Sequence, residues 1–309
     1  MNQGGKAAVL LVAHGTPENA DDIPCFLHAV TGGRELPQAV IDEVQHRYAL
    51  IGRSPLLDFS RKQAEAVQRE LGLPVYLGMR NWTPYIREVA PQMAVDGVAR
   101  AVVICLAPQN SRTSVGLYRK AVADAQAAAA LNGGKIFTTD FVESWHDHPL
   151  LAAAFAEKLE PGWKRACREA GSDLPVIFTA HSVPERTIAA GDPYERQARE
   201  TAALVVAKVG GPVVHNWRFA FQSQGMSGGP WLGPTVEETM LALKQEGHKG
   251  IFLQPVGFLC DHVEVLYDID IAFRQFAQAN GLKLWRAESL NDSPLLAAAL
   301  AGVARKRIG

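Results

Sequence analysis

The fold is decided by Gly250-Ile-Phe-Leu-Gln-Pro-Val-Gly-Phe-Leu-Cys-Asp-His-Val-Glu-Val-Leu-Tyr-Asp-Ile-Asp270, a stretch in the last fifth of the chain. Its first part, residues 251–253, is a short apolar run typical of a buried strand. Pro255 and Gly257 end that run, and a helix is expected to follow. A strand, a sharp turn and then a helix is how an open α/β sheet presents a functional site at the ends of its strands.

The helix expected after this turn carries two acidic residues. Asp261 can cap the helix, and Glu264 and Asp268 are four residues apart, so both carboxylates face the same way. Like charges at this spacing weaken a helix by roughly a few tenths of a kcal/mol, a cost that is offset if the pair meets a cation. The stretch therefore predicts a cation-binding face, with His262 and Asp270 at its flanks.

The composition describes an ordinary soluble globular protein. The 309 residues suffice for one large domain or two of about 150 residues. A net charge of −1 gives no electrostatic reason to expect nucleic acid or an anionic membrane as a partner. No apolar stretch approaches the ~18 residues of a membrane-spanning helix, and the N-terminus runs into a strand without a signal peptide. We therefore expect a cytoplasmic protein.

The cysteines give no sign of a disulfide framework or a metal cluster. Cys25, Cys105, Cys167 and Cys260 are scattered and form no C-x-x-C pair. Reduced thiols are therefore expected, as in other cytosolic proteins.

Two patterns occur twice and indicate an internal duplication. Ala-His-x-x-Pro-Glu follows an apolar run at residues 13–18 and again at residues 180–185. Trp82-Thr-Pro and Trp231-Leu-Gly-Pro each precede a helical segment and then a strand. Chance similarity is the alternative, but two matches in the same order favour a duplicated α/β unit.

Strands and helices are expected to alternate along the whole chain. The strands are predicted at residues 7–13, 75–77, 101–106, 136–139, 175–180, 213–221, 251–253 and 283–285. The helices are predicted at residues 58–71, 114–131, 149–170 (interrupted at Pro161-Gly162), 194–209 and from Pro294 onward, the last one capped by Ser293.

This alternation predicts the α/β fold class, with parallel sheets covered by helices on both faces. Two similar halves imply two Rossmann-like sheets that face a central cleft. We place the N-terminal half at residues 1–150 and the C-terminal half at residues 151–309, with a last helix that can pack back on the first half.

The ends of the strands carry the residues best suited to chemistry. The chain contains neither G-x-G-x-x-G after the first strand nor a phosphate-binding P-loop, which excludes the usual dinucleotide and nucleoside-triphosphate sites. His181 and its duplicate His14 each follow a strand, where they could be catalytic or simply structural. Imidazole together with the carboxylates suits a borderline divalent metal such as Fe²⁺. Without a third closely spaced ligand, we expect transient rather than structural metal binding.

Other polar and aromatic residues could complete a binding site, although each alone could equally be surface or core. The polar candidates at loops and helix ends are Arg34, Arg47, Arg53, Ser54, Arg112 and Tyr118. The aromatic residues that could line a flat apolar pocket with Tyr118 are Trp82, Trp231 and Phe258.

Taken together, the motifs resemble those of ferrochelatases over nearly the whole chain. The most specific are Phe178-Thr-Ala-His-Ser-Val-Pro-Glu and Pro255-Val-Gly-Phe-Leu-Cys-Asp-His-Val-Glu-Val-Leu-Tyr-Asp. Further matches are Leu11-Val-Ala-His-Gly-Thr-Pro, Leu106-Ala-Pro-Gln-Asn-Ser and Val142-Glu-Ser-Trp.

The resemblance implies an enzyme, a lyase that inserts Fe²⁺ into a porphyrin in heme biosynthesis. It implies His181 and Glu264 as the catalytic pair, with Asp268 as a further metal ligand beside them. Iron would be a substrate, with no permanently bound cofactor and no iron–sulfur cluster, and the protein would be a monomer. The porphyrin-binding residues implied are His14, Arg34, Arg47, Arg53, Ser54, Tyr118, Trp231 and Phe258.

The wording of the motifs favours coproporphyrin III as the porphyrin. Protoporphyrin IX is the near alternative, followed by a cobalt, nickel or sirohydrochlorin-type chelatase and by a non-catalytic carrier of porphyrin or heme. The chain departs from the family pattern at Ala272, where many relatives continue the acidic line, and at His14, where the coproporphyrin branch has tyrosine. The arginine-rich loop of that branch is reduced here to Gly32-Gly-Arg34.

Overall fold

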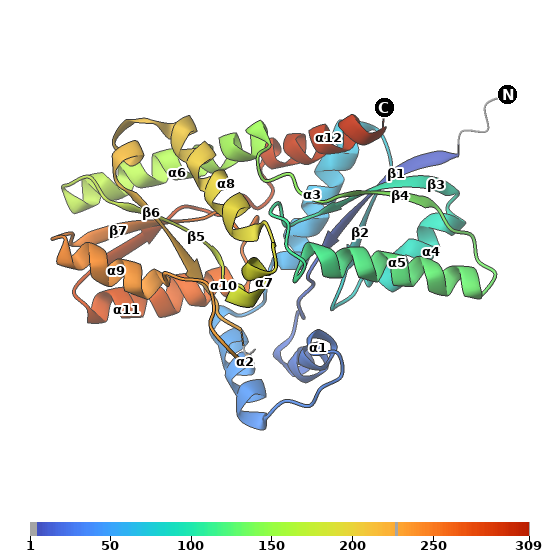
Figure 1. Cartoon of the computed structure of the whole chain (residues 1–309), viewed down its shortest axis with the longest axis horizontal. Helices are drawn as coiled ribbons and strands as arrows, with labels where there is room; N and C mark the ends of the chain where they lie inside the picture. Colours follow the sequence, from blue (N-terminus) through green and yellow to red (C-terminus); the bar gives the residue numbers. More distant parts are fainter. Residues whose placement is uncertain (1–4, 226–227, 309) are drawn as a thin grey trace. The chain divides into compact units, whose positions relative to one another are not determined.

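The computed structural model describes residues 5–225 and 228–308, and it confirms an α/β fold with two four-stranded parallel sheets (Figure 1). The described residues form two compact units. Unit 1 comprises Met1–Pro108, Ser114–Trp145 and Asn291–Gly309, and unit 2 comprises Gln109–Thr113 and His146–Leu290. The partition of the sequence into halves at residue 150 stays a prediction.

The sheet of unit 1 has the strand order β2-β1-β3-β4. The strands are β1 (Lys6–Ala13), β2 (Val75–Met79), β3 (Val98–Cys105) and β4 (Thr138–Val142), all parallel. Central β1 is apolar without interruption from Ala7 onward because helices cover both of its faces. On one face, Ile86, Met93 and Val122 pack in one core cluster with Leu10.

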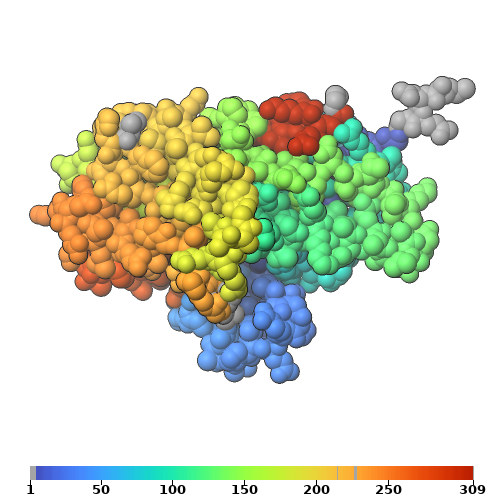
Figure 2. Space-filling model, in the orientation of Figure 1, coloured from blue at the N-terminus to red at the C-terminus, as the bar shows by residue number. Residues whose placement is uncertain are grey.

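Helices complete unit 1 around this sheet. Figure 1 shows α4 and α5 on one face, and α3 and α12 on the other. The bounds are α1 (Ile23–Val30), α2 (Gln38–Ile51), α3 (Leu56–Leu71), α4 (Ile86–Val95), α5 (Val115–Leu131) and α12 (Pro294–Ile308), with a short 3₁₀ turn η1 (Ala20–Asp22). Figure 2 shows α1 and α2, in blue, as a projection from unit 1. Tyr48 is the one fully buried side chain of α2.

The last helix packs on α3 within unit 1. Arg305 donates to the carbonyl of Glu70 at 2.6 Å and pairs with its carboxylate at 3.2 Å. Exposed pairs of this kind contribute about 0–1 kcal/mol each. The buried side chains of α12, among them Leu296 and Leu300, therefore carry most of the attachment.

Unit 2 repeats the same strand order, β6-β5-β7-β8, as the duplication hypothesis predicts. Its parallel strands are β5 (Val176–His181), β6 (Trp217–Gln222), β7 (Gly250–Pro255) and β8 (Lys283–Arg286). The Trp82 and Trp231 copies of the second motif also lead into matching helix starts. Glu88 in α4 accepts from the backbone N–H of Tyr85 at 3.4 Å, and Glu238 in α9 accepts from the backbone N–H of Thr235 at 2.8 Å.

Helices cover both faces of the second sheet. Figure 1 shows α6 and α8 on one face, and α9 and α11 on the other. The bounds are α6 (Pro149–Ala170), α7 (Glu185–Ala189), α8 (Tyr194–Val209), α9 (Val236–Gln245), α10 (Val263–Leu266) and α11 (Arg274–Ala279). The shorter helical turns are η2 (Gly211–His215), a 3₁₀ helix, and η3 (Asp268–Phe273), a π-helix.

Several expected boundaries differ from the structure, and the strand predicted at residues 136–139 lies at Thr138–Val142. The interruption of α6 at Pro161 is wrong, because the helix continues through it as Leu159 and Trp163 bury one of its faces. The strand expected from residue 213 is also wrong. Gly210 and Gly211 have φ values of 67° and 60°, so the chain turns into η2 and becomes extended only at Trp217.

Neither of the two expected side-chain caps is formed. The hydroxyl of Ser293 is buried and has no hydrogen-bond partner in the described part of the chain, whereas the Ser293 carbonyl accepts from Ala297 at 3.1 Å. Asp261 caps no helix, because its carboxylate is bound to other residues of unit 2. His262 occupies the cap position of α10 instead.

No helix within residues 5–225 and 228–308 is both long and apolar enough to cross a membrane.

Gly257 permits the close approach of the turn after β7 to the end of β5. A Cβ at this position would lie 2.8 Å from the Cβ and 3.0 Å from the Cα of Ala180, the residue before His181. We predict that Gly257→Ala lowers the free energy of unfolding by about 1–3 kcal/mol, the usual cost of overpacking, in urea denaturation.

Gly228→Ala is the matched control, because its added Cβ would meet no atom within 4 Å. The control should change the free energy of unfolding by less than about 0.5 kcal/mol. Equal stability of the two variants would contradict the close approach at Gly257.

Candidate active site

His181 is the last residue of β5, at the carboxyl edge of the second sheet. Its Nδ1 is in short contact with the carbonyl of Ser182. Because a carbonyl only accepts hydrogen bonds, Nδ1 carries the proton of the neutral ring. The lone pair of the neutral imidazole is therefore on Nε2.

Glu264 lies in α10, and its Oε1 is 3.5 Å from Nε2 of His181. Its backbone is anchored to the neighbouring strand end, because the Gln222 amide donates to the Glu264 carbonyl at 2.9 Å. The hydroxyl of Thr179 in turn donates to Gln222 at 3.1 Å. The side chains of His181 and Glu264 are 33% and 35% exposed, so both remain accessible to a substrate.

A second imidazole, His262, lies on the other side of Glu264. Its Nε2 is 3.9 Å from Oε2 of Glu264, and its ring packs edge-on against Phe258 at 4.7 Å. From the sequence, His262 is expected only at the flank of the site. Its position two residues before Glu264 is the signal that could have included it.

The environments of the two imidazoles push their pKa values in opposite directions. Burial disfavours the charged form of His181, but the carboxylate of Glu264, the Ser182 carbonyl and the charge of Asp268 outweigh it and raise the pKa. Burial dominates at His262 and lowers its pKa despite Glu264. His181 is therefore the ring better suited to hold a proton, while His262 stays neutral.

Asp268 lies beside this pair but not on the single α-helix that the sequence predicts. The helix α10 ends at Leu266, and the π-helix η3 follows, in which the Ala272 amide donates to the Tyr267 carbonyl at 2.9 Å. The hydroxyl of Ser223, directly after β6, donates to Oδ2 of Asp268. π-Turns inside helical segments are frequent at functional sites.

The other two acidic residues of this segment are bound by residues at and after the end of β8. Asp261 accepts hydrogen bonds from Ser289 at 2.7 Å and from Arg286 at 3.2 Å. Asp270 accepts two hydrogen bonds from Arg286, at 2.8 and 2.7 Å. Of the acidic residues between 261 and 270, Glu264 and Asp268 are therefore the two that present carboxylates near His181.

Two further aromatic residues surround His181. The hydroxyl of Tyr194 donates to the His181 carbonyl at 2.9 Å, and burial, together with Glu264 and Asp192, raises the pKa of Tyr194. The ring of Trp231 lies 6.5 Å from the imidazole. The sequence predicts Trp231 but misses Tyr194, although the stretch Gly191-Asp-Pro-Tyr194 is a further match to the ferrochelatase motifs and could have indicated it.

His14 occupies the corresponding strand end in unit 1. The amide nitrogen of Asn81 lies 3.2 Å from its ring nitrogens, and Phe26 packs edge-on against it at 6.0 Å. Ser54 is buried and accepts from the hydroxyl of Thr16 at 3.0 Å. His14 and Ser54 are thus fixed by neighbours within unit 1.

The remaining predicted residues of unit 1 differ in burial and in whether a carboxylate already pairs with them. Arg47 pairs with Glu43 at 2.8 Å, and Arg53 pairs with Asp58. Arg34 donates to the carbonyl of Thr31 at 3.2 Å, and no carboxylate of the described chain pairs with it. Tyr118 is buried in the core between α4 and α5. Within unit 2, the structure brings together the predicted residues His181, Trp231, Phe258, Glu264 and Asp268.

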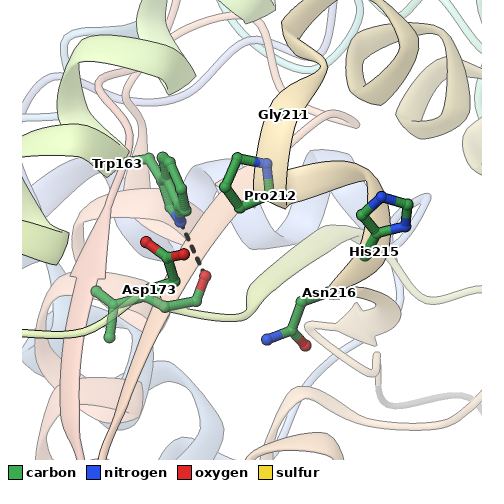
Figure 3. Close-up of a pocket in the computed structure, with 7 residues that line it drawn as sticks. Trp163, Asp173, Gly211, Pro212, His215 and Asn216 are labelled. Carbon is green, nitrogen blue, oxygen red and sulfur yellow. Dashed lines mark hydrogen bonds between the residues drawn. The ribbon is translucent and has the colours of Figure 1, made fainter.

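A cavity of about 610 Å³ in unit 2 is separate from these residues (Figure 3). Trp163 lines it and donates to the Leu174 carbonyl at 2.8 Å. Leu174 and Asn216 precede β5 and β6, so the cavity lies at the amino ends of these strands. His181 and Glu264 lie at the opposite edge of the same sheet.

Comparison with known proteins decides the family. The family model described as ferrochelatase matches residues 6–308. The chain belongs to the ferrochelatase family. A ferrochelatase of Acidobacterium capsulatum is 55% identical over 314 residues, which cover 97% of this chain and 94% of that protein. A coproporphyrin III ferrochelatase of Geobacillus sp. is 36% identical, with 98% of each chain covered.

Solved chelatase structures share the fold of this ferrochelatase. The sirohydrochlorin chelatase SirB of Bacillus subtilis subspecies spizizenii, in complex with cobalt, superposes with a TM-score of 0.58 at 12% identity, and covers 97% of this chain and 94% of its own. SirB from Bacillus subtilis with Fe³⁺ gives a TM-score of 0.60 at 13% identity, covering 97% and 95%. At such identities the likeness establishes the fold alone.

Family membership confirms the expected class of reaction. This ferrochelatase is a lyase that inserts iron into a porphyrin for heme biosynthesis. Iron and porphyrin are therefore its substrates.

We predict that Glu264→Gln lowers the pKa of His181, because the neutral amide removes the attraction that outweighs burial. The pKa can be measured by following the histidine ring resonances by NMR as a function of pH. The matched control is Glu200→Gln, since Glu200 pairs with His146 at 2.7 Å and not with His181. A His181 pKa that is the same in both variants would refute the assigned role of the Glu264 carboxylate.

Proposed function

We propose that the enzyme inserts Fe²⁺ into coproporphyrin III and that His181 and Glu264 accept the protons that leave the porphyrin. The contact between Nε2 of His181 and Oε1 of Glu264, at 3.5 Å, carries this proposal. It joins the proton-free nitrogen of a neutral imidazole to a carboxylate at an accessible strand end. The motifs that the family resemblance assigns to catalysis supply both residues.

The proton balance of the reaction needs two acceptors. As Fe²⁺ binds the four nitrogens of the porphyrin, both pyrrole N–H groups lose their protons and the neutral metalloporphyrin forms. In our proposal Nε2 of His181 accepts one proton, and Glu264 stabilises the imidazolium and accepts the other. Both side chains are about one third exposed, so the protons can pass to water.

Glu264 and Asp268 are proposed to guide hydrated iron to His181. Both carboxylates lie on the segment that begins at α10, and the charge of Asp268 reaches the imidazole. The described residues contain no group of three or more histidine, cysteine or acidic side chains arranged to hold a metal ion. A donor set of one imidazole and two carboxylates that does not enclose the ion suits a metal that has to be passed on.

The porphyrin is proposed to contact His14, Arg34, Arg47, Arg53, Ser54, Tyr118, Trp231 and Phe258. Of the three arginines, Arg34 has the guanidinium that no described carboxylate neutralises, so it is the best suited to bind a propionate. A propionate at Arg47 or Arg53 would compete with Glu43 or Asp58. The indole of Trp231 beside His181 offers an apolar surface for the macrocycle.

The choice of coproporphyrin III is supported by relatives that carry that name. The Geobacillus protein is one of them and aligns over almost its whole length. The name of the Acidobacterium relative specifies no porphyrin. Protoporphyrin IX, with fewer propionates, is the alternative substrate.

We expect His181→Ala to abolish iron insertion, because it removes the Nε2 lone pair that would first bind iron and then, once the iron has left it, take a proton. Glu264→Gln should lower kcat by roughly 10²-fold or more, the scale of general-base catalysis. The assay is anaerobic consumption of porphyrin fluorescence with Fe²⁺, and binding of porphyrin alone should persist in both variants. Glu200→Gln, which removes the carboxylate paired with His146, is the control and should keep full activity. Near-normal turnover of His181→Ala would disprove its role.

The substrate is tested by supplying coproporphyrin III and protoporphyrin IX separately with Fe²⁺ under anaerobic conditions. We expect a higher kcat/KM for coproporphyrin III, and Arg34→Gln should reduce that preference because it removes the guanidinium that is free of carboxylates. Arg47→Gln, which removes an arginine already paired with Glu43, is the matched control and should have a smaller effect. Faster insertion into protoporphyrin IX would overturn the choice of coproporphyrin III.

A further inference from the structure

Arg286, the last residue of β8, lies between two carboxylates behind the candidate site. Its Nε and Nη2 donate to the two oxygens of Asp270 at 2.8 and 2.7 Å. Its Nη2 also donates to Asp261 at 3.2 Å. The Arg286 side chain is only 13% exposed, so this is a largely buried clamp rather than a surface ion pair.

The two carboxylates flank the segment that carries the site residues. Asp261 directly precedes His262, and Asp270 follows Asp268 by two residues. Glu264 lies between them. A single guanidinium therefore ties both ends of this segment to the end of β8.

The segment needs such a tie because its backbone is irregular. It passes from an extended residue, His262, through the single turn of α10 into a π-helix, a rare conformation that mostly occurs as a single turn. Ser289 strengthens the clamp by donating to Asp261 at 2.7 Å. The planar fork of arginine can bond two carboxylates in fixed directions, which a lysine ammonium does not reproduce.

We propose that Arg286 is a positioning residue for metal insertion, which fixes His262 and Glu264 at one end of the segment and Asp268 at the other in the arrangement that receives iron. Arg286 makes no contact with the reacting atoms in this scheme and acts only through the clamped segment. The proposal rests on the roles proposed for Glu264 and Asp268. The proposal adds that Arg286, at the end of β8, sets the distances between these groups.

The test is Arg286→Lys, which keeps the charge but loses the two-sided bonding. We expect the KM for Fe²⁺ to rise roughly tenfold or more and kcat to fall, because small displacements of positioned groups have large effects on rate. The KM for the porphyrin should stay within about twofold of the original value. Arg286→Lys is also expected to bind Co²⁺, titrated by calorimetry in the absence of porphyrin, more weakly than the unmodified chain.

Arg274→Gln is the matched control. Arg274 pairs with the same Asp270 at 3.5 Å, but from the surface, where its side chain is 53% exposed. This variant should leave both KM values and the Co²⁺ affinity unchanged. If Arg286→Lys does not fold, Asp270→Asn replaces it, because it breaks the clamp on one side while Arg286 keeps Asp261.

A merely structural role predicts a different outcome. Loss of folded enzyme would lower kcat with both KM values and the Co²⁺ affinity intact, and that result would overturn the proposal. His181→Ala is measured in parallel to separate the two hypotheses. Full turnover in His181→Ala with weakened Co²⁺ binding in Arg286→Lys would refute the proposed catalytic role of His181 and retain the clamp.

Discussion

The contact between the imidazole of His181 and the carboxylate of Glu264 is the interaction on which the rest of the site depends. Burial alone would lower the pKa of this imidazole, and the carboxylate, together with the Ser182 carbonyl and Asp268, raises it instead. Parallel pairing brings the two groups together, because β5 and β7 are neighbours and their carboxyl ends lie at one edge of the sheet. Two further residues support this contact. Gly257 lets the turn after β7 lie close to Ala180, and Gln222 donates a hydrogen bond to the backbone carbonyl of Glu264.

Local pattern in the sequence predicts those parts of the fold that depend on neighbouring residues. It predicts helix α8 at its observed bounds, and strands β1 and β5 within one residue, because their apolar spacing is strong. It does not predict the π-helix, or that Asp261 is bound by Arg286 and Ser289 rather than capping a helix, because those two partners lie farther along the chain. Asp261 could cap a helix by its position alone, but Arg286 and Ser289 bind it instead.

The candidate site is predictable to a similar extent. Strand-end placement and acidic spacing are enough to propose His181, Glu264 and Asp268 as candidates, and the family resemblance implies their roles. They do not identify His262 or Tyr194 as part of the candidate site. His262 is included because it is buried beside Glu264, and Tyr194 because its hydroxyl donates to the His181 carbonyl. The sequence also does not show which arginines are already neutralised. Family membership supplies the reaction, while the structure supplies the tautomer of His181 and so the atom that can take the proton.

The π-helix makes the length of its segment as important as its composition. An α-turn contains 3.6 residues, and a π-turn contains about one more, so each residue inserted or removed rotates the rest of the helix by about 100°. Loss of one residue between Tyr267 and Asp270 would leave Glu264 in place and rotate the carboxylate of Asp270 away from Arg286. Natural variation in this family should therefore tolerate exchanges of side chain here more readily than insertions or deletions. The number of residues in the π-helix therefore fixes the directions in which the acidic side chains on either side of it point.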